Sequence, residues 1–99
     1  METYFKGTEL KPKIELTAQG FSMATDDFEI EVKSGRSSIT MTKEDLIVKN
    51  GEYYAYIDTN ELPAGTLKLV GTLHVPDSDA PDGIRNEICV TNLCSIVNP

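Results

Sequence analysis

The chain has 99 residues, of which 39% are hydrophobic, and its formal net charge at pH 7 is −7. A chain of this length makes one domain, residues 1–99, with a single small core. The excess of negative charge argues against nucleic acid and anionic membranes as partners, because both attract basic surfaces.

The N-terminal residues 1–7 contain neither an apolar run nor a cleavage-site pattern, so we expect no signal peptide and synthesis in the cytoplasm. No run in the sequence approaches the roughly 18 apolar residues of a membrane-spanning helix.

The first half of the chain predicts two alternating strands. In residues 13–18, Ile14 and Leu16 alternate with polar residues, and Pro12 before them suggests the start of a strand or an edge. Residues 28–33 alternate more regularly, with apolar side chains directed inward and charged ones outward.

A turn at residues 34–37 then leads into residues 38–42, which are rich in β-branched side chains and predict a further strand. Residues 42–45 can form one helical turn, with Thr42 as its cap and Asp45 at its third position.

A hairpin is predicted around Asn50 and Gly51, because a two-residue turn of type I′ needs positive φ at both central residues. With these two residues as the loop, Lys49 faces Glu52, and the opposite charges favour this register. The inward face then carries Leu46, Val48, Tyr53, Ala55 and Ile57.

The second half of the chain predicts one long strand and two shorter ones. A turn at residues 62–65 precedes residues 66–75, which alternate almost without interruption. A polar loop follows at residues 76–83. Residues 84–90 predict another strand, and residues 93–97 a possible last one.

Short strands separated by frequent turns, without a helix of useful length, predict an all-β protein. We expect an immunoglobulin-like β-sandwich of about seven to eight antiparallel strands, with a small β-barrel as the alternative. The predicted core consists of Phe28, Ile30, Val32, Leu46, Val48, Tyr53, Ile57, Leu67, Leu69 and Leu73.

The two cysteines, Cys89 and Cys94, are too few for a disulfide framework. Two reduced thiols in a strand are expected in a reducing compartment. If residues 91 and 92 formed a two-residue turn instead, the cysteines would face each other and could form a disulfide.

An enzyme is not expected. His74 is the sole histidine and the natural general base, but its position in the alternating strand places it on the polar face. The 16 carboxylates lie scattered along outward faces, whereas a catalytic pair needs one shared apolar pocket. No catalytic or cofactor-binding residue is therefore assigned.

The loop at residues 77–83 has a composition that resembles a calcium loop, because Asp77, Asp79 and Asp82 precede a glycine. The third aspartate comes one residue late, and Pro81 stiffens the loop. We expect the aspartates to cap backbone N–H groups, with weak binding of Ca²⁺ as the alternative.

The outward face of the predicted hairpin carries Ile47, Tyr54 and Tyr56. Three large side chains close together exceed the scattered apolar exposure of an ordinary surface. They are interface candidates for contact with another subunit. The alternative is that residues 3–12 lie over them.

Two sequence strings follow one another across a short turn and an apolar strand: EYYAYIDT at residues 52–59 and VPDSDAPDGIRNE at residues 75–87. The strand at residues 28–33 and the segment at residues 42–46 precede them. In this order they resemble small immunoglobulin-like modules of phage and prophage structural proteins, such as modules of baseplate and tail-fibre components, including those of Bacteroides-type prophages. The resemblance covers residues 14–90.

This resemblance implies a non-enzymatic structural module of a virion that works through protein–protein contacts. Its implied partners are other structural proteins or further copies of itself, and no site residues carry over. The alternative is a free-standing domain that binds a carbohydrate or a host protein. Tyr54 and Tyr56 would then offer the aromatic platform, since the chain has no tryptophan.

Overall fold

The computed structural model describes residues 2–99, which form ten β-strands and two 3₁₀ turns. In chain order the strands are β1 Thr3–Phe5, β2 Glu9–Leu10, β3 Lys13–Ile14, β4 Phe28–Ser34, β5 Ser37–Thr42, β6 Ile47–Lys49, β7 Glu52–Tyr54, β8 Ile57–Asp58, β9 Gly65–Pro76 and β10 Ile84–Val97. The turns η1 and η2 cover Lys43–Asp45 and Thr59–Glu61. Within the residues described, no helical segment has the length and apolar character needed to cross a membrane.

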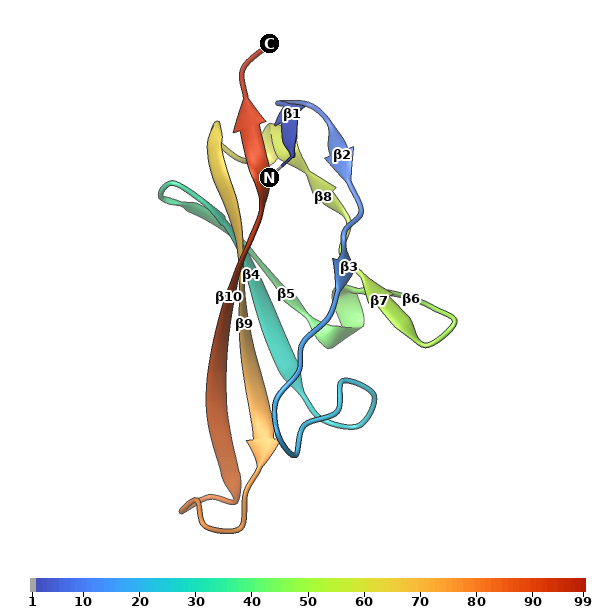
Figure 1. Cartoon of the computed structure of the whole chain (residues 1–99), viewed down its shortest axis with the longest axis vertical. Helices are drawn as coiled ribbons and strands as arrows, with labels where there is room; N and C mark the ends of the chain where they lie inside the picture. The colour runs from blue at the N-terminus through green and yellow to red at the C-terminus, as the bar shows by residue number, and fades with distance from the viewer. Residues whose placement is uncertain (1) are drawn as a thin grey trace.

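The main sheet has five strands in the order β1-β10-β9-β4-β5 (Figure 1). Two hairpins supply four of them, β4 with β5 and the longer β9 with β10. β1 runs parallel to the end of β10, whereas the other neighbours are antiparallel. The sheet is therefore mixed, and β5 forms one of its edges.

Short strands form smaller sheets opposite the main one: β2 pairs with β8, and β3, β7 and β6 pair in that order. Figure 1 shows the hairpin of β6 and β7 projecting away from the main sheet. The described chain is elongated along β9 and β10, with extents of 50 × 30 × 21 Å.

Apolar side chains from both layers form one buried cluster. Its members are Ile14, Leu16, Phe28, Ile30, Val32, Met41, Leu46, Ala55, Ile57, Leu62, Leu67, Leu69, Leu73, Val75, Cys94 and Ile96. Leu16 packs closely on β9, because a Cβ added to Gly71 would lie 2.8 Å from its Cδ2. The predicted core is confirmed except at Val48 and, in part, Tyr53, which is half-buried against the cluster.

The predicted Asn-Gly turn is confirmed. Asn50 and Gly51 have φ values of 53° and 77°, and Lys49 pairs with Glu52. The helical turn after Thr42 is also confirmed as η1, where the Asp45 carboxylate accepts a hydrogen bond of 2.9 Å from the Thr42 N–H.

The inward assignment of Val48 is wrong, since this side chain is 57% exposed. Val48 does face Tyr53 across the hairpin, as the register predicts. Tyr53, however, reaches the core, where its ring packs edge-to-face on Phe28 at 6.1 Å between centroids. Val48 lies one strand farther out, on the edge strand β6, where no second layer covers it.

Two strand boundaries also differ from prediction. The strands expected at residues 84–90 and 93–97 are one continuous strand, β10, with a bulge between Asn92 and Cys94. The strand expected at residues 13–18 is regular only as β3, because the Leu16 N–H donates to Met23 Sδ instead of a neighbouring strand.

The all-β expectation is thus confirmed at the level of strands and open sheets. The sheets do not close, so the barrel alternative is wrong, and the parallel pairing of β1 with β10 departs from the expected all-antiparallel arrangement.

Candidate functional site

The outer edge of β10 is open along most of its length. β1 pairs with β10 only from Ser95 to Val97. From residue 84 to residue 92, no other strand within the described chain lies beside this edge, while the opposite edge of β10 pairs with β9 throughout. The edge therefore offers unpaired backbone groups to a further strand.

The ladder with β9 decides which residues present these groups. The Asp77 N–H donates to the Gly83 carbonyl at 2.9 Å, directly before the pair Pro76 and Ile84. Because hydrogen-bonded and non-hydrogen-bonded pairs alternate in an antiparallel ladder, Gly83 and every second residue after it face β9. The groups directed to the open edge therefore belong to Ile84, Asn86, Ile88, Val90 and Asn92, of which the Ile84 N–H already donates to Asp82.

Large aliphatic side chains line the same stretch. Ile84, Ile88 and Val90 are 47%, 68% and 62% exposed. They share the outer face of the sheet, since the alternate residues of β10 pair with the buried residues of β9. Natural sheets protect exposed edges with lysine, proline or very short strands. Residues 84–92 contain neither lysine nor proline.

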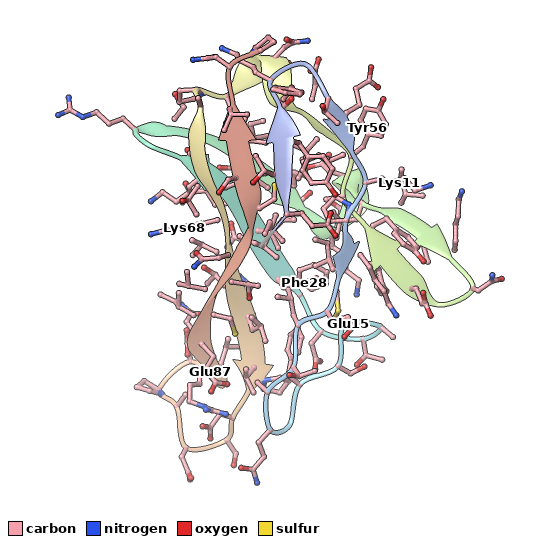
Figure 2. The ribbon with its side chains drawn as sticks, turned by 45° about the horizontal axis from the view of Figure 1, so that its top comes forward. Lys11, Glu15, Phe28, Tyr56, Lys68 and Glu87 are labelled. Carbon is pink, nitrogen blue, oxygen red and sulfur yellow. The ribbon has the colours of Figure 1, made fainter. Side chains whose placement is uncertain are left out.

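Arg85 and Glu87 lie between these aliphatic residues, on the opposite face of β10. The Arg85 Nε lies 3.1 Å from Asp77 Oδ2, whereas its Nη1 lies 3.8 Å from Glu87 Oε2. That Glu87 oxygen is shielded from solvent and has no hydrogen-bond partner among residues 2–99. Figure 2 shows Glu87 on the lower part of the β9–β10 hairpin.

The sequence predicted a strand at residues 84–90 but missed its exposed edge, because periodicity does not reveal a strand's place in a sheet. A signal was present nonetheless. Extending the hairpin register across the loop from Val75 places Arg85 on the inward face and Ile84 and Ile88 on the outward face. In an ordinary sheet the aliphatic residues of a strand point inward and the charged ones outward, so this pattern is reversed.

His74 lies on the outer face of the main sheet, as predicted. Its Nδ1 lies 2.8 Å from Asn86 Oδ1 and its Nε2 lies 3.0 Å from Glu29 Oε1. Hydrogen bonds to Asn86 and Glu29 raise the pKa of His74. Because both ring nitrogens are engaged, neither is directed at a hydroxyl or thiol nucleophile.

The loop at residues 77–83 uses its aspartates as backbone caps. Asp77 Oδ1 accepts a hydrogen bond from the Asp79 N–H at 2.9 Å, and Asp82 Oδ1 accepts one from the Ile84 N–H at 3.1 Å. Within residues 2–99, no group of three or more His, Cys, Asp or Glu side chains is arranged to hold a metal ion. Asp77, Asp79 and Asp82 therefore do not form a preassembled calcium site.

The predicted outward face of the β6–β7 hairpin is partly occupied. Ile47 and Tyr54 pair and are half-buried, while Tyr56 is 51% exposed. The Tyr54 hydroxyl donates to Glu52 at 2.9 Å, which raises the pKa of Tyr54 and lowers that of Glu52. Lys11 lies over the Tyr54 ring at 5.6 Å, so the N-terminal segment covers part of this face.

Figure 2 shows Lys11 and Tyr56 on the side of the molecule away from the β9–β10 hairpin. The open edge of β10 and the tyrosine face are therefore separate surfaces. On the tyrosine face, Tyr56 is the strongly exposed ring, and one ring is a small platform for a carbohydrate.

Both cysteines are free. The turn at residues 91 and 92 that would bring them together is not formed, because β10 continues through this region. Cys89 is half-buried, and burial of Cys94 raises the pKa of its thiol.

Hollows in the surface adjoin β10, and Val90 lines one of about 610 Å³. Another of about 470 Å³ lies where β1 meets the β10 bulge, lined by residues that include Glu2, Lys11 and Leu93. Cys94 also lines this hollow, but burial raises the pKa of its thiol and so disfavours the thiolate that a nucleophile needs.

Comparison of the chain with protein-family models, with curated proteins and with solved structures finds no match. The function is therefore argued from the geometry of this chain, with the open edge of β10 as its candidate functional site.

Proposed function

We propose that this protein is a non-enzymatic assembly module that acts through protein–protein contacts along the open edge of β10. The observation that carries the proposal is the stretch at residues 84–92, which combines unpaired backbone groups with three exposed aliphatic side chains. Addition of a strand to such an edge satisfies the backbone groups and buries apolar area in one step.

The electrostatics of the site support binding rather than catalysis. The sole histidine has both ring nitrogens engaged by Asn86 and Glu29. General acid–base chemistry needs a titratable group within reach of a reacting proton. The open edge offers instead the combination of unsatisfied main-chain groups and aliphatic side chains that an added strand uses for affinity and specificity.

The biological setting that we propose is a phage or prophage particle, in which the chain is an immunoglobulin-like module. This part of the proposal rests on the resemblance between the strand-and-turn order of residues 14–90 and that of baseplate and tail-fibre modules. Structural components of particles act by repeated contacts between copies and neighbours, and closed symmetry is the common result. Other structural proteins and further copies of this chain are the partners that fit.

Sedimentation velocity over a wide range of protein concentration tests the proposed edge. Ile88→Lys places a charge in the middle of the open edge, a device that natural sheets use to prevent edge pairing. Val48→Lys is the matched control, because Val48 is similarly exposed but lies on the separate β6–β7 hairpin. We expect the wild type and Val48→Lys to associate and Ile88→Lys to sediment as a monomer.

Two results would contradict this proposal. If the wild type stays monomeric at the highest concentration, it has no self-associating edge. If Ile88→Lys associates as strongly as the wild type, the contact lies elsewhere.

A further inference from the structure

We infer that a second copy of this chain pairs with the open edge of β10, antiparallel and in one register, with the two-fold axis at Asn86. This inference rests on the proposed function and names its partner and geometry. In this register Ile84 of each copy faces Ile88 of the other copy. Arg85 of each copy likewise faces Glu87 of the other.

The alternating direction of the backbone groups along β10 permits this pairing. Ile84, Asn86 and Ile88 direct their N–H and C=O groups to the open side, as the ladder with β9 requires. A two-fold axis at Asn86 sets these residues against one another as hydrogen-bonded pairs. Each copy then satisfies the edge groups of Asn86 and Ile88 on the other, and the Ile84 N–H exchanges its hydrogen bond with Asp82 for one to the partner copy.

Charge complementarity selects a second copy as the occupant. Arg85 and Glu87 have opposite charges and are separated by one residue, so an antiparallel copy reverses their order and faces each with its opposite. They occupy non-hydrogen-bonded positions of the new ladder, where side chains of facing residues lie closest. The Glu87 oxygen that lacks a hydrogen-bond partner would gain the partner copy's guanidinium.

Other registers along the edge lack this match. An axis at Glu87 would set the two Glu87 carboxylates against each other, which is unfavourable. An axis at Ile88 would set Arg85 against Thr91 and Glu87 against Cys89, which leaves both without an opposite charge on the partner copy. The Asn86 register also keeps the added strand clear of β1, which begins its pairing at Ser95.

The outer face is compatible with the same register. Ile84 and Ile88, both strongly exposed in one copy, would contact each other across the axis at two equivalent places. The Asn86 side chain points along the sheet to His74 at 2.8 Å, so it is held away from the approaching strand.

Charge exchange between two variants tests the inference. Arg85→Glu and Glu87→Arg each place like charges opposite one another in a homodimer, and we expect each to weaken self-association at least about tenfold. Mixed in equal amounts, the two variants regain opposite charges at both contacts, so the mixture is expected to form heterodimers that neither variant forms alone. Asp77→Asn is the control, because it removes the intrachain ion pair of Arg85 with Asp77 and leaves the proposed contact intact.

Cysteine cross-linking then reads the register directly, in a Cys89→Ser background. Asn86→Cys places two thiols at the axis, whereas Ile88→Cys places them roughly 13 Å apart, beyond the reach of a disulfide. We expect oxidised dimers from Asn86→Cys and none from Ile88→Cys.

The outcomes separate the inference from the proposed function. If Ile88→Lys abolishes the dimer, the open edge is the contact. If the dimer also cross-links through Ile88→Cys, or if the charge exchange leaves its stability unchanged, the Asn86 register is wrong. A wild type without dimers at any concentration would overturn both.

Discussion

The carboxylate of Glu29 on β4 lies 3.0 Å from Nε2 of His74 on β9, and Asn86 on β10 lies 2.8 Å from the other ring nitrogen. The three side chains join three adjacent strands across the outer face of the main sheet. Two acceptor oxygens around one imidazole favour its protonated form, so the pKa of His74 is raised in the folded state.

This row of side chains makes the stability of the fold depend on pH. Because the pKa of His74 is higher in the folded than in the unfolded chain, its contribution is fully present below the unfolded value of about 6.5 and is lost as pH rises through the folded value. We expect the free energy of unfolding to fall by the ~0.2–1 kcal/mol typical of partly exposed ion pairs. Urea unfolding at pH 5.5, 7 and 8.5 measures it.

His74→Gln is the control for this measurement, because glutamine retains hydrogen-bonding capacity without titrating. Its free energy of unfolding should vary less over the same range, where the chain has no other histidine. Equal pH profiles for the two proteins would show that the His74 row adds nothing to stability.

The long strand β9 alternates between the core and solvent, which gives a matched pair of substitutions. Leu69 is 5% exposed and Lys68 is exposed. Leu69→Ala should lower the free energy of unfolding by about 2–5 kcal/mol, since it removes buried methyl groups and leaves a cavity. Lys68→Ala should change it by less than about 0.5 kcal/mol. Unfolding curves in urea test both, and equal effects would invalidate the inward assignment of Leu69.

A substitution in the turn of the β6–β7 hairpin tests the backbone conformation at a position where the side chain has no packing contacts. Gly51 has φ of 77°, and apart from Gly51 and its two chain neighbours no residue has a heavy atom within 4 Å of a Cβ added there. Gly51→Val should therefore destabilise the fold through backbone strain alone, by about 1–3 kcal/mol. Gly51→Asn should cost less, because asparagine adopts positive φ more readily. Thermal unfolding of both variants checks the order, and a neutral Gly51→Val would exclude a rigid turn.

The sequence was sufficient for features that depend on local chemistry. The Asn50-Gly51 turn, the Thr42 cap and the two faces of β9 each follow from a few neighbouring residues. The exposed position of Val48 did not follow, because it depends on how far the second layer extends over an edge strand.

The candidate site was harder to predict for the same reason. Whether β10 is an edge depends on the order of strands in space, and β1 comes from the opposite end of the chain. Residues 84–90 alternate equally well in a central or an edge strand, so their alternation predicted a strand without showing that one side is open.

The tyrosine face provides the last prediction, because its two tyrosines differ in their contacts. Tyr54 donates to Glu52 and lies beneath Lys11, so Tyr54→Glu would place a carboxylate beside another carboxylate and should lower stability. Tyr56 is 51% exposed, and Tyr56→Glu should leave stability within about 0.5 kcal/mol of the wild type. The Tyr56→Glu variant should therefore remain folded, so any change in its association does not come from loss of structure.

If the edge of β10 carries self-association, Tyr56→Glu should sediment as the wild type does at every concentration. The double variant Tyr54→Glu, Tyr56→Glu should do the same wherever it remains folded, as judged by circular dichroism. A shift of Tyr56→Glu towards the monomer would assign the contact to the face of Ile47, Tyr54 and Tyr56, because a new charge there disrupts an apolar interface but cannot reach a strand added to β10.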